Sequence, residues 1–225
     1  MIKNLIFDVG DVLIEYRWRE MLYDHGVTGA AAERIGPELF EARQWRELDA
    51  GEISVEEAIR EYQALFPEDS EVIAWFLRNA QLMVVQRPEL WDKIEALKKR
   101  GYGIYLLSNY CKELFDKHTA GAGFLNDLDG GVISYQIHKT KPDPGIYSFL
   151  LQKYGLNPSE CLFFDDRAEN VEAAQKLGIA AVQITSREKI GRQLVIYALS
   201  DFLIMILSWL VKQSLRAFLF QEVQP

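Results

Sequence analysis

Carboxylate, hydroxyl, amide and ammonium groups recur along this chain close to the ends of short apolar segments. A carboxylate that leaves a strand and is followed by a tight turn can present an oxygen to an open cleft. Paired carboxylates suit a hard cation such as Mg²⁺, and a lysine beside them can neutralise an anionic group. Such groups in one place would suit chemistry on a phosphate ester. The residues are Asp8, Asp11, Ser108, Asn109, Lys141, Asp165, Asp166 and Asn170.

The elements that must position these groups alternate between short apolar runs and helical patterns. The runs are rich in β-branched or aromatic residues and are too short for buried helices. Alternation of this kind predicts an α/β fold, a Rossmann-like doubly wound parallel sheet with helices on both faces. Ligands of such sheets bind beyond the carboxyl ends of the strands. The predicted strands are Ile2–Phe7, Gly103–Leu107, Cys161–Phe164 and Ala180–Ile184, and the predicted helices are Trp91–Arg100, Pro144–Tyr154 and Ala168–Leu177.

The segment 15–87 has a different character, with helical periodicity and few strand signals. Ser54 followed by Glu57 is a capping box, which marks a helix start. We therefore expect an all-helical cap domain inserted after the first strand. Its predicted helices are Pro37–Leu48, Ser54–Phe66 and Glu71–Leu82.

The last 33 residues, 193–225, form a predicted apolar helix or tail. Leu194–Val211 is almost entirely apolar with a thin polar stripe, barely long enough to cross a bilayer. Asp201 near its middle would cost about 2.5–3.5 kcal/mol on insertion. A helix packed on protein is favoured over a membrane anchor, and residues 193–220 could serve self-association or membrane contact.

Composition places the chain among ordinary globular proteins, with 49% hydrophobic and 26% charged residues. Its net charge of −8, without a basic patch, argues against a nucleic-acid partner. Cys111 and Cys161 follow no metal-binding pattern and are expected to be structural. The N-terminus shows no signal-peptide pattern, so a cytoplasmic location is expected.

The eight residues named above fall into four short segments, and these segments, in their order along the chain, resemble the motifs of haloacid dehalogenase-like hydrolases. The similarity covers roughly residues 1–190 and includes the helical insertion after the first motif, which is typical of the subfamily with a helical cap. It implies a core domain at 1–14 plus 88–192 and a cap at 15–87. The motifs are Asp8-Val9-Gly10-Asp11, Ser108-Asn109, Lys141-Pro142 and Asp165-Asp166 with Asn170.

The resemblance also implies roles for these residues. Asp8 would attack phosphorus and form an aspartyl-phosphate. Ser108, Asn109 and Lys141 would bind the phosphoryl oxygens, with Asp8, Ser108 and Lys141 as the catalytic group. The implied cofactor is Mg²⁺ and the implied substrate is a small phosphorylated metabolite. The implied metal ligands are Asp8, the Gly10 carbonyl, Asp166 and Asn170, supported by Asp165.

One position departs from the usual pattern of this family. A second aspartate normally follows two residues after the nucleophile and acts as acid and base, but here that place is Gly10. Asp11, one residue further, is a possible but displaced substitute. The motif is closest to a branch that includes glucose-1-phosphate phosphatases, so a sugar phosphate is a reasonable substrate.

Two other functions stay open on the sequence. A 2-haloacid dehalogenase also lacks the second aspartate, although it works without a metal. A non-catalytic binding or regulatory protein could keep the fold without the acid. Arg167 is expected only to start a helix. We expect surface or loop roles for His25, His118 and His138, and core packing for Trp18, Trp45 and Trp75.

Overall fold

A five-stranded parallel sheet forms the centre of the protein in the computed structural model, which describes residues 1–186 and 188–195. The strand order is β5-β4-β1-β6-β7, so β1 lies in the middle and pairs with β4 on one side and β6 on the other. The strands are β1 (Asn4–Phe7), β4 (Gly103–Ser108), β5 (Gly130–Ile133), β6 (Cys161–Asp165) and β7 (Ala180–Gln183).

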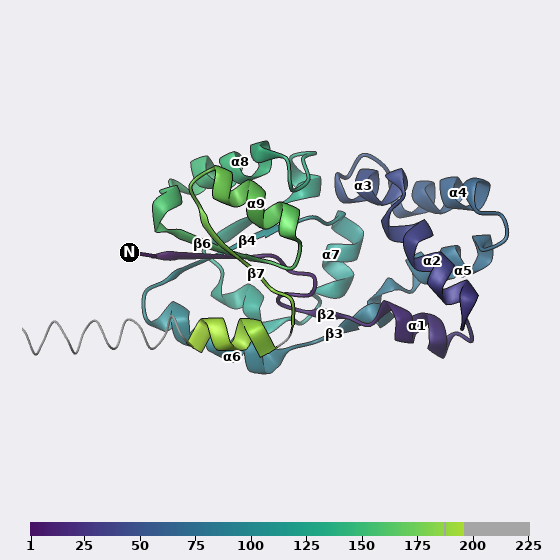
Figure 1. Cartoon of the computed structure of the whole chain (residues 1–225), viewed down its shortest axis with the longest axis horizontal. Coiled ribbons are helices and arrows are strands. Elements are labelled where there is room, and N and C mark those ends of the chain that lie inside the picture. The colour runs from purple at the N-terminus through teal and green to yellow at the C-terminus, as the bar shows by residue number, and fades with distance from the viewer. Residues whose placement is uncertain (187, 196–225) are drawn as a thin grey trace, which may run out of the picture.

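Alternation along the strands divides the apolar side chains between two cores. Leu5 and Phe7 face one core, which α6 and α7 cover, whereas Ile6 faces the other, which α8 and α9 cover. Figure 1 shows these layers, with α8 and α9 on one side of the sheet and α6 on the other. The helices are α6 (Pro88–Lys99), α7 (Lys112–His118), α8 (Pro144–Tyr154) and α9 (Ala168–Lys176).

The doubly wound parallel fold predicted from the sequence is therefore confirmed, with one strand missed. Strand β5 begins with Gly130 and Gly131, which have low strand propensity. A β-carbon on Gly131 would lie 2.8 Å from the Cβ of Leu106 on β4. Close approach of the neighbouring strand, rather than local propensity, accounts for this strand.

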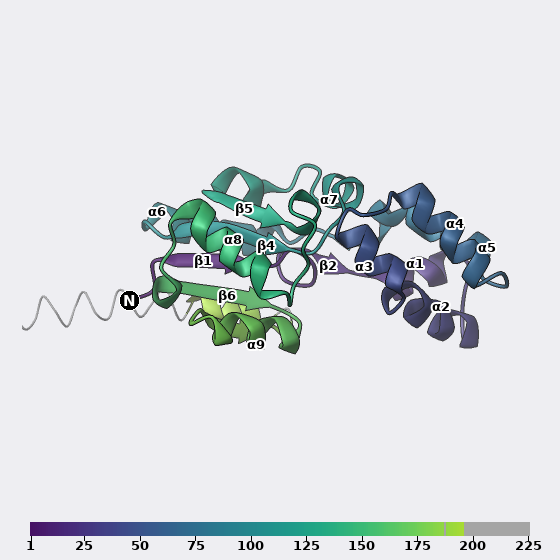
Figure 2. The ribbon, with the colours of Figure 1, turned by 90° about the horizontal axis from the view of Figure 1, so that it is seen from above.

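Helices α1 to α5 form a separate bundle joined to the sheet domain by a two-strand ladder, in which β2 (Glu15–Tyr16) pairs with β3 (Val84–Val85). Figure 2 shows β2 leading from the core toward α1, with α3 nearest the strand ends. The bundle contains α1 (Trp18–Asp24), α2 (Ala30–Phe40), α3 (Arg43–Asp49), α4 (Val55–Leu65) and α5 (Ser70–Arg78).

The helical insertion differs in detail from the expectation. The single helix predicted over Pro37–Leu48 is wrong, because α2 ends at Phe40 and α3 begins at Arg43. Proline favours a helix start, but Pro37 lies inside α2. Helix α1 was not predicted. The exact division into 1–14, 15–87 and 88–192 stays a prediction.

Most of the predicted C-terminal tail, residues 196–225, lies outside the described residues, as does residue 187. Residues 188–195 are helical, and Ile190 and Leu194 join the core on the α6 side of the sheet. Within 1–186 and 188–195, no helix combines the length and apolar character needed to cross a membrane.

The capping box at the start of α4 supplies a stability test. The Glu57 backbone N–H donates to Ser54 Oγ at 3.2 Å, and the Ser54 N–H donates to Glu57 Oε2 at 2.8 Å. We expect Ser54→Ala to lower the free energy of unfolding by about 1 kcal/mol, because the Glu57 backbone N–H loses its acceptor. Chemical denaturation measures the change.

Ser70→Ala is the matched control, because Ser70 is the first residue of α5 and not its N-cap, which is Asp69. Equal losses for the two variants would contradict the assignment.

Candidate active site

Asp8 lies at the carboxyl end of β1 and is held in one orientation by three donors. Its Oδ1 accepts hydrogen bonds from Ser108 Oγ at 2.5 Å and the Val9 N–H at 2.8 Å, and Lys141 Nζ lies 2.9 Å away. The side chain is only 11% exposed. Since all three contacts involve Oδ1, Oδ2 remains for a reacting group.

Lys141 joins the ends of two neighbouring strands. Its ammonium group is buried and bonds Asp165 Oδ2 on β6 at 2.6 Å as well as Asp8 on β1. Burial alone would lower the pKa of Lys141, but Asp165 and Asp8 outweigh it and the pKa is raised. Lys141 is therefore a fixed positive charge at the centre of the site.

Asn109 holds Lys141 in place through the backbone. Its side-chain amide donates to the Lys141 carbonyl at 3.0 Å and accepts from the Lys141 N–H at 2.8 Å. The structure thus shows a positioning contact for Asn109, while its predicted bond to a phosphoryl group stays a prediction.

The predicted residues of the fourth motif gather around Asp165, which is fully buried. Its carboxylate accepts from the Arg167 N–H at 2.8 Å and from the Asn170 side chain at 2.9 Å, besides Lys141. Both oxygens are thereby occupied. This agrees with a supporting place for Asp165, behind Asp166 and Asn170, which line the pocket.

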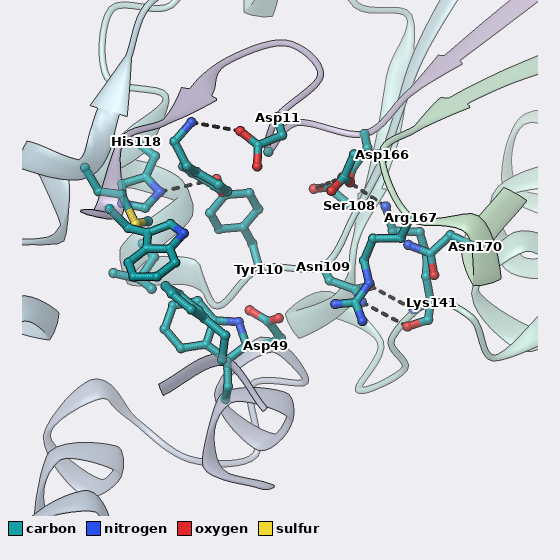
Figure 3. Close-up of a pocket in the computed structure, with 18 residues that line it drawn as sticks. Asp11, Asp49, Ser108, Asn109, Tyr110, His118, Lys141, Asp166, Arg167 and Asn170 are labelled. Atoms are coloured by element: carbon teal, nitrogen blue, oxygen red, sulfur yellow. Dashed lines mark hydrogen bonds and ion pairs between the residues drawn. The ribbon is translucent and has the colours of Figure 1, made fainter. Parts of the chain in front are cut away.

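Residues of the cap and the core together line an open cavity of about 230 Å³ at this site. Asp49, the last residue of α3, points into it from the cap side, across from Asp166 (Figure 3). Burial and the nearby charge of Asp8 raise the pKa of Asp49 to about 7. The apolar part of the cap-side wall consists of Trp18, Phe40, Trp45 and Met83.

Sequence reasoning missed Asp49 and expected Trp18 and Trp45 only in the cap core. They line the pocket because α1 and α3 face the strand ends, and no local pattern signals that placement. Trp75 lies elsewhere and stacks on the exposed His25 with 3.5 Å between ring centroids.

A buried hydrogen-bonded chain forms another wall. The Tyr16 hydroxyl contacts the Tyr110 hydroxyl, which lies 3.2 Å from His118 Nδ1, and His118 Nε2 lies 3.0 Å from the Ala80 carbonyl. Burial lowers the pKa of His118 to about 4, so the ring is neutral at pH 7. The expected surface role of His118 is wrong, because the ladder β2–β3 and α7 enclose it.

Asp11 turns toward the start of the cap linker. It adopts a left-handed conformation with φ of 51°, and its Oδ1 accepts from the Tyr16 N–H at 2.9 Å. Figure 3 shows this bond drawing the carboxyl away from Asp166. Asp11 therefore stabilises the turn after β1.

A family model described as haloacid dehalogenase-like hydrolase matches residues 2–178. The chain belongs to this family. This confirms the resemblance inferred from the four motifs.

Relatives within the family include both phosphatases and dehalogenases. D-ribitol-5-phosphate phosphatase of Bacteroides thetaiotaomicron is 28% identical over 199 residues, covering 81% of this chain and 92% of that protein. (S)-2-haloacid dehalogenase 4A of Burkholderia cepacia is 29% identical over 127 residues, 56% of this chain and 54% of that protein.

A solved haloacid dehalogenase-family enzyme from Bacteroides thetaiotaomicron, in complex with magnesium and inorganic phosphate, has the same fold. It superposes with a TM-score of 0.64 at 23% identity, covering 81% of this chain and 94% of that one.

The donor set of this family member fits a divalent cation. Asp8, Asp165 and Asp166 offer carboxylate oxygens within 4.8 Å of one another. Asn170 Oδ1 is buried and accepts no hydrogen bond. Burial and the crowding of carboxylates raise the pKa of Asp8 to about 6 and of Asp166 to about 7. A cation would satisfy the orphaned oxygen and relieve the repulsion, which suits Mg²⁺.

Replacing one carboxylate should therefore stabilise the cation-free protein and abolish cation binding. We expect Asp166→Asn to raise the melting temperature in EDTA at pH 7.5, by about 2–4 °C for each kcal/mol of repulsion removed. Mg²⁺ at about 100 times its dissociation constant should add about 2.7 kcal/mol to the wild type and nothing to the variant. Differential scanning calorimetry measures both effects.

The pH dependence provides an internal check. Because the pKa values of Asp8 and Asp166 are raised, the folded protein binds more protons than the unfolded chain between about pH 4 and 7. These groups make the cation-free wild type more stable as the pH falls from 7.5 to 5.5, and the gain should shrink in Asp166→Asn. Glu172→Gln removes an exposed carboxylate from α9, the helix that follows Asp166, and should behave like the wild type. If it matched Asp166→Asn, the charge cluster would not be the cause.

Proposed function

We propose that this protein is a magnesium-dependent phosphatase that hydrolyses a small phosphorylated metabolite through an aspartyl-phosphate on Asp8. The observation that carries the proposal is the buried Asp8 carboxylate, with one oxygen held by Ser108, Val9 and Lys141 and the other left for attack. The ammonium group of Lys141 offsets the repulsion between this carboxylate and a phosphate dianion.

The reaction takes place in two steps. In the first, Asp8 Oδ2 attacks phosphorus, a new O–P bond forms, and the bond from phosphorus to the alcohol oxygen breaks. In the second, water attacks the same phosphorus, which frees inorganic phosphate and restores Asp8. Asp165 and the amide of Asn109 keep Lys141 in position throughout. When bound, Mg²⁺ held by Asp8, the Gly10 carbonyl, Asp166 and Asn170 would supply further positive charge.

The cavity supports a small polar substrate with an apolar face. Its volume of about 230 Å³ lies below that of sites for drug-sized ligands. Trp18 and Trp45 supply apolar surface for the C–H groups of a sugar or polyol, while Asp49 and Arg167 supply polar groups. A relative named for D-ribitol 5-phosphate supports the same class, so a phosphorylated sugar or polyol is the proposed substrate.

A 2-haloacid dehalogenase is the second candidate, favoured by the relative in Burkholderia cepacia and by Gly10 in place of the usual second aspartate. The orphaned Asn170 oxygen beside three carboxylates supports a metal-dependent enzyme instead.

A panel of sugar and polyol phosphates, assayed for phosphate release with Mg²⁺ or EDTA, tests the proposal. We expect turnover only with Mg²⁺, and none for Asp8→Asn, because a neutral amide cannot form the aspartyl-phosphate. Chloride release from 2-chloropropionate in EDTA would instead establish the dehalogenase. A folded, Mg²⁺-binding protein that releases neither product would be a binding protein.

A further inference from the structure

The leaving alcohol of a phosphate ester needs a proton, and Gly10 cannot carry the group that normally supplies it. A β-carbon on Gly10 would lie 2.5 Å from a ring carbon of Tyr16. Tyr16 is kept in place by its contact with Tyr110. The Tyr16 ring thus occupies the space that an aspartate side chain at position 10 would need.

The tyrosines themselves are poor proton donors to a substrate. Neutral His118 carries its proton on Nε2, which donates to the Ala80 carbonyl, so Nδ1 accepts from the Tyr110 hydroxyl. The Tyr110 oxygen then accepts from Tyr16. Both phenolic protons therefore point toward His118, and burial raises the pKa of both tyrosines. Asp11 is likewise bound to the turn.

Asp49 is the remaining carboxyl that projects into the cavity, apart from the group around Lys141. The core holds the cap turn that carries it: Ser134 Oγ donates to the Asp49 carbonyl, and His138 Nδ1 lies 2.9 Å from the Ala50 carbonyl. Gly51 continues the turn with φ of 68°, and a β-carbon there would lie 2.9 Å from Tyr135. These contacts fix Asp49 relative to Asp8.

The position of Asp49 is unfavourable for stability. A carboxylate in the last turn of a helix faces the negative end of the helix dipole, and Asp49 ends α3. Lys141, Arg167 and a hydrogen bond from Trp45 favour its ionised form, but burial and Asp8 act more strongly and raise its pKa. Burial raises the pKa of Tyr62, Tyr110 and Cys111, and the charge of Asp49 adds to the rise in each. Carboxyl groups with strongly shifted pKa values are concentrated at functional sites.

We infer that Asp49 is the general acid and base of this enzyme, supplied by the cap in place of the aspartate missing at position 10. This rests on the proposed phosphatase function. As the bond from phosphorus to the alcohol oxygen breaks, the Asp49 carboxyl gives its proton to that oxygen and becomes a carboxylate. It then takes a proton from the water that attacks the aspartyl-phosphate, so phosphate leaves and Asp49 is protonated again.

Two esters with different leaving groups test this inference. A sugar or polyol phosphate releases an alcohol that needs a proton, whereas 4-nitrophenyl phosphate releases a stable phenolate. We expect Asp49→Asn to lower kcat/KM about 100-fold or more for the first ester and less than about tenfold for the second, because general acids contribute roughly 10²–10⁴. With 4-nitrophenyl phosphate, the variant should also show a burst of product and then slow turnover, since the base for the second step is missing.

The pH profile gives a second readout. For the alkyl ester, wild-type kcat/KM should fall above about pH 7, where Asp49 loses its proton, and Asp49→Asn should lack this alkaline decline. Asp49→Glu, which keeps the carboxyl, should recover part of the activity on the alkyl ester. Glu47→Gln removes another carboxylate from α3, one that pairs with Arg43. This variant should hydrolyse both esters at the wild-type rate.

The outcomes separate this inference from the proposed function. A wild type that hydrolyses none of the esters overturns both. A second outcome is that the wild type turns over, but Asp49→Asn loses equal activity on the two esters, shows no burst and keeps the alkaline decline. This result would assign Asp49 to binding alone and overturn only the inference. Unchanged activity in Asp49→Asn overturns it as well.

Discussion

The buried contact between one ammonium and two carboxylates organises this protein. Lys141 lies 2.9 Å from Asp8 and 2.6 Å from Asp165, and therefore ties together the ends of β1 and β6. Transferring a charged group from water to the protein interior costs roughly several kcal/mol of free energy per ion, unless the ion is paired and hydrogen-bonded. Here Ser108, Asn170 and backbone N–H groups complete the pairing, so the arrangement is stable only when all the strand ends are in register.

An excess of negative charge remains after this pairing, and it explains two properties of the site. Asp8, Asp165 and Asp166 share one fixed cation, which leaves the cluster suited to a divalent ion. The same negative field extends to the cap, where Asp8 raises the pKa of Asp49. Burial of Asp49 contributes more to this rise than the charge of Asp8 does.

Much of the core and its site could be predicted from the sequence, because the motifs at Asp8, Ser108 and Asp165 lie at the ends of strands and parallel strands end at one edge of the sheet. Prediction failed where long-range packing outweighs local preference. Gly131 forms part of a strand because Leu106 lies close to it. His118 is buried because the cap linker covers it, and the break between α2 and α3 lacks a strong local signal.

The fold class, the family and most residues of the site can be inferred from the amino-acid sequence, since hydrophobic periodicity and motif spacing are local properties of the chain. The residue that we infer replaces the missing aspartate could be recognised only from tertiary packing. Tyr16 occupies the space beside Gly10, and the cap turn at Asp49 docks on Ser134 and His138, more than 80 positions later. Contacts between segments so far apart depend on how the cap packs against the core, which no local pattern encodes.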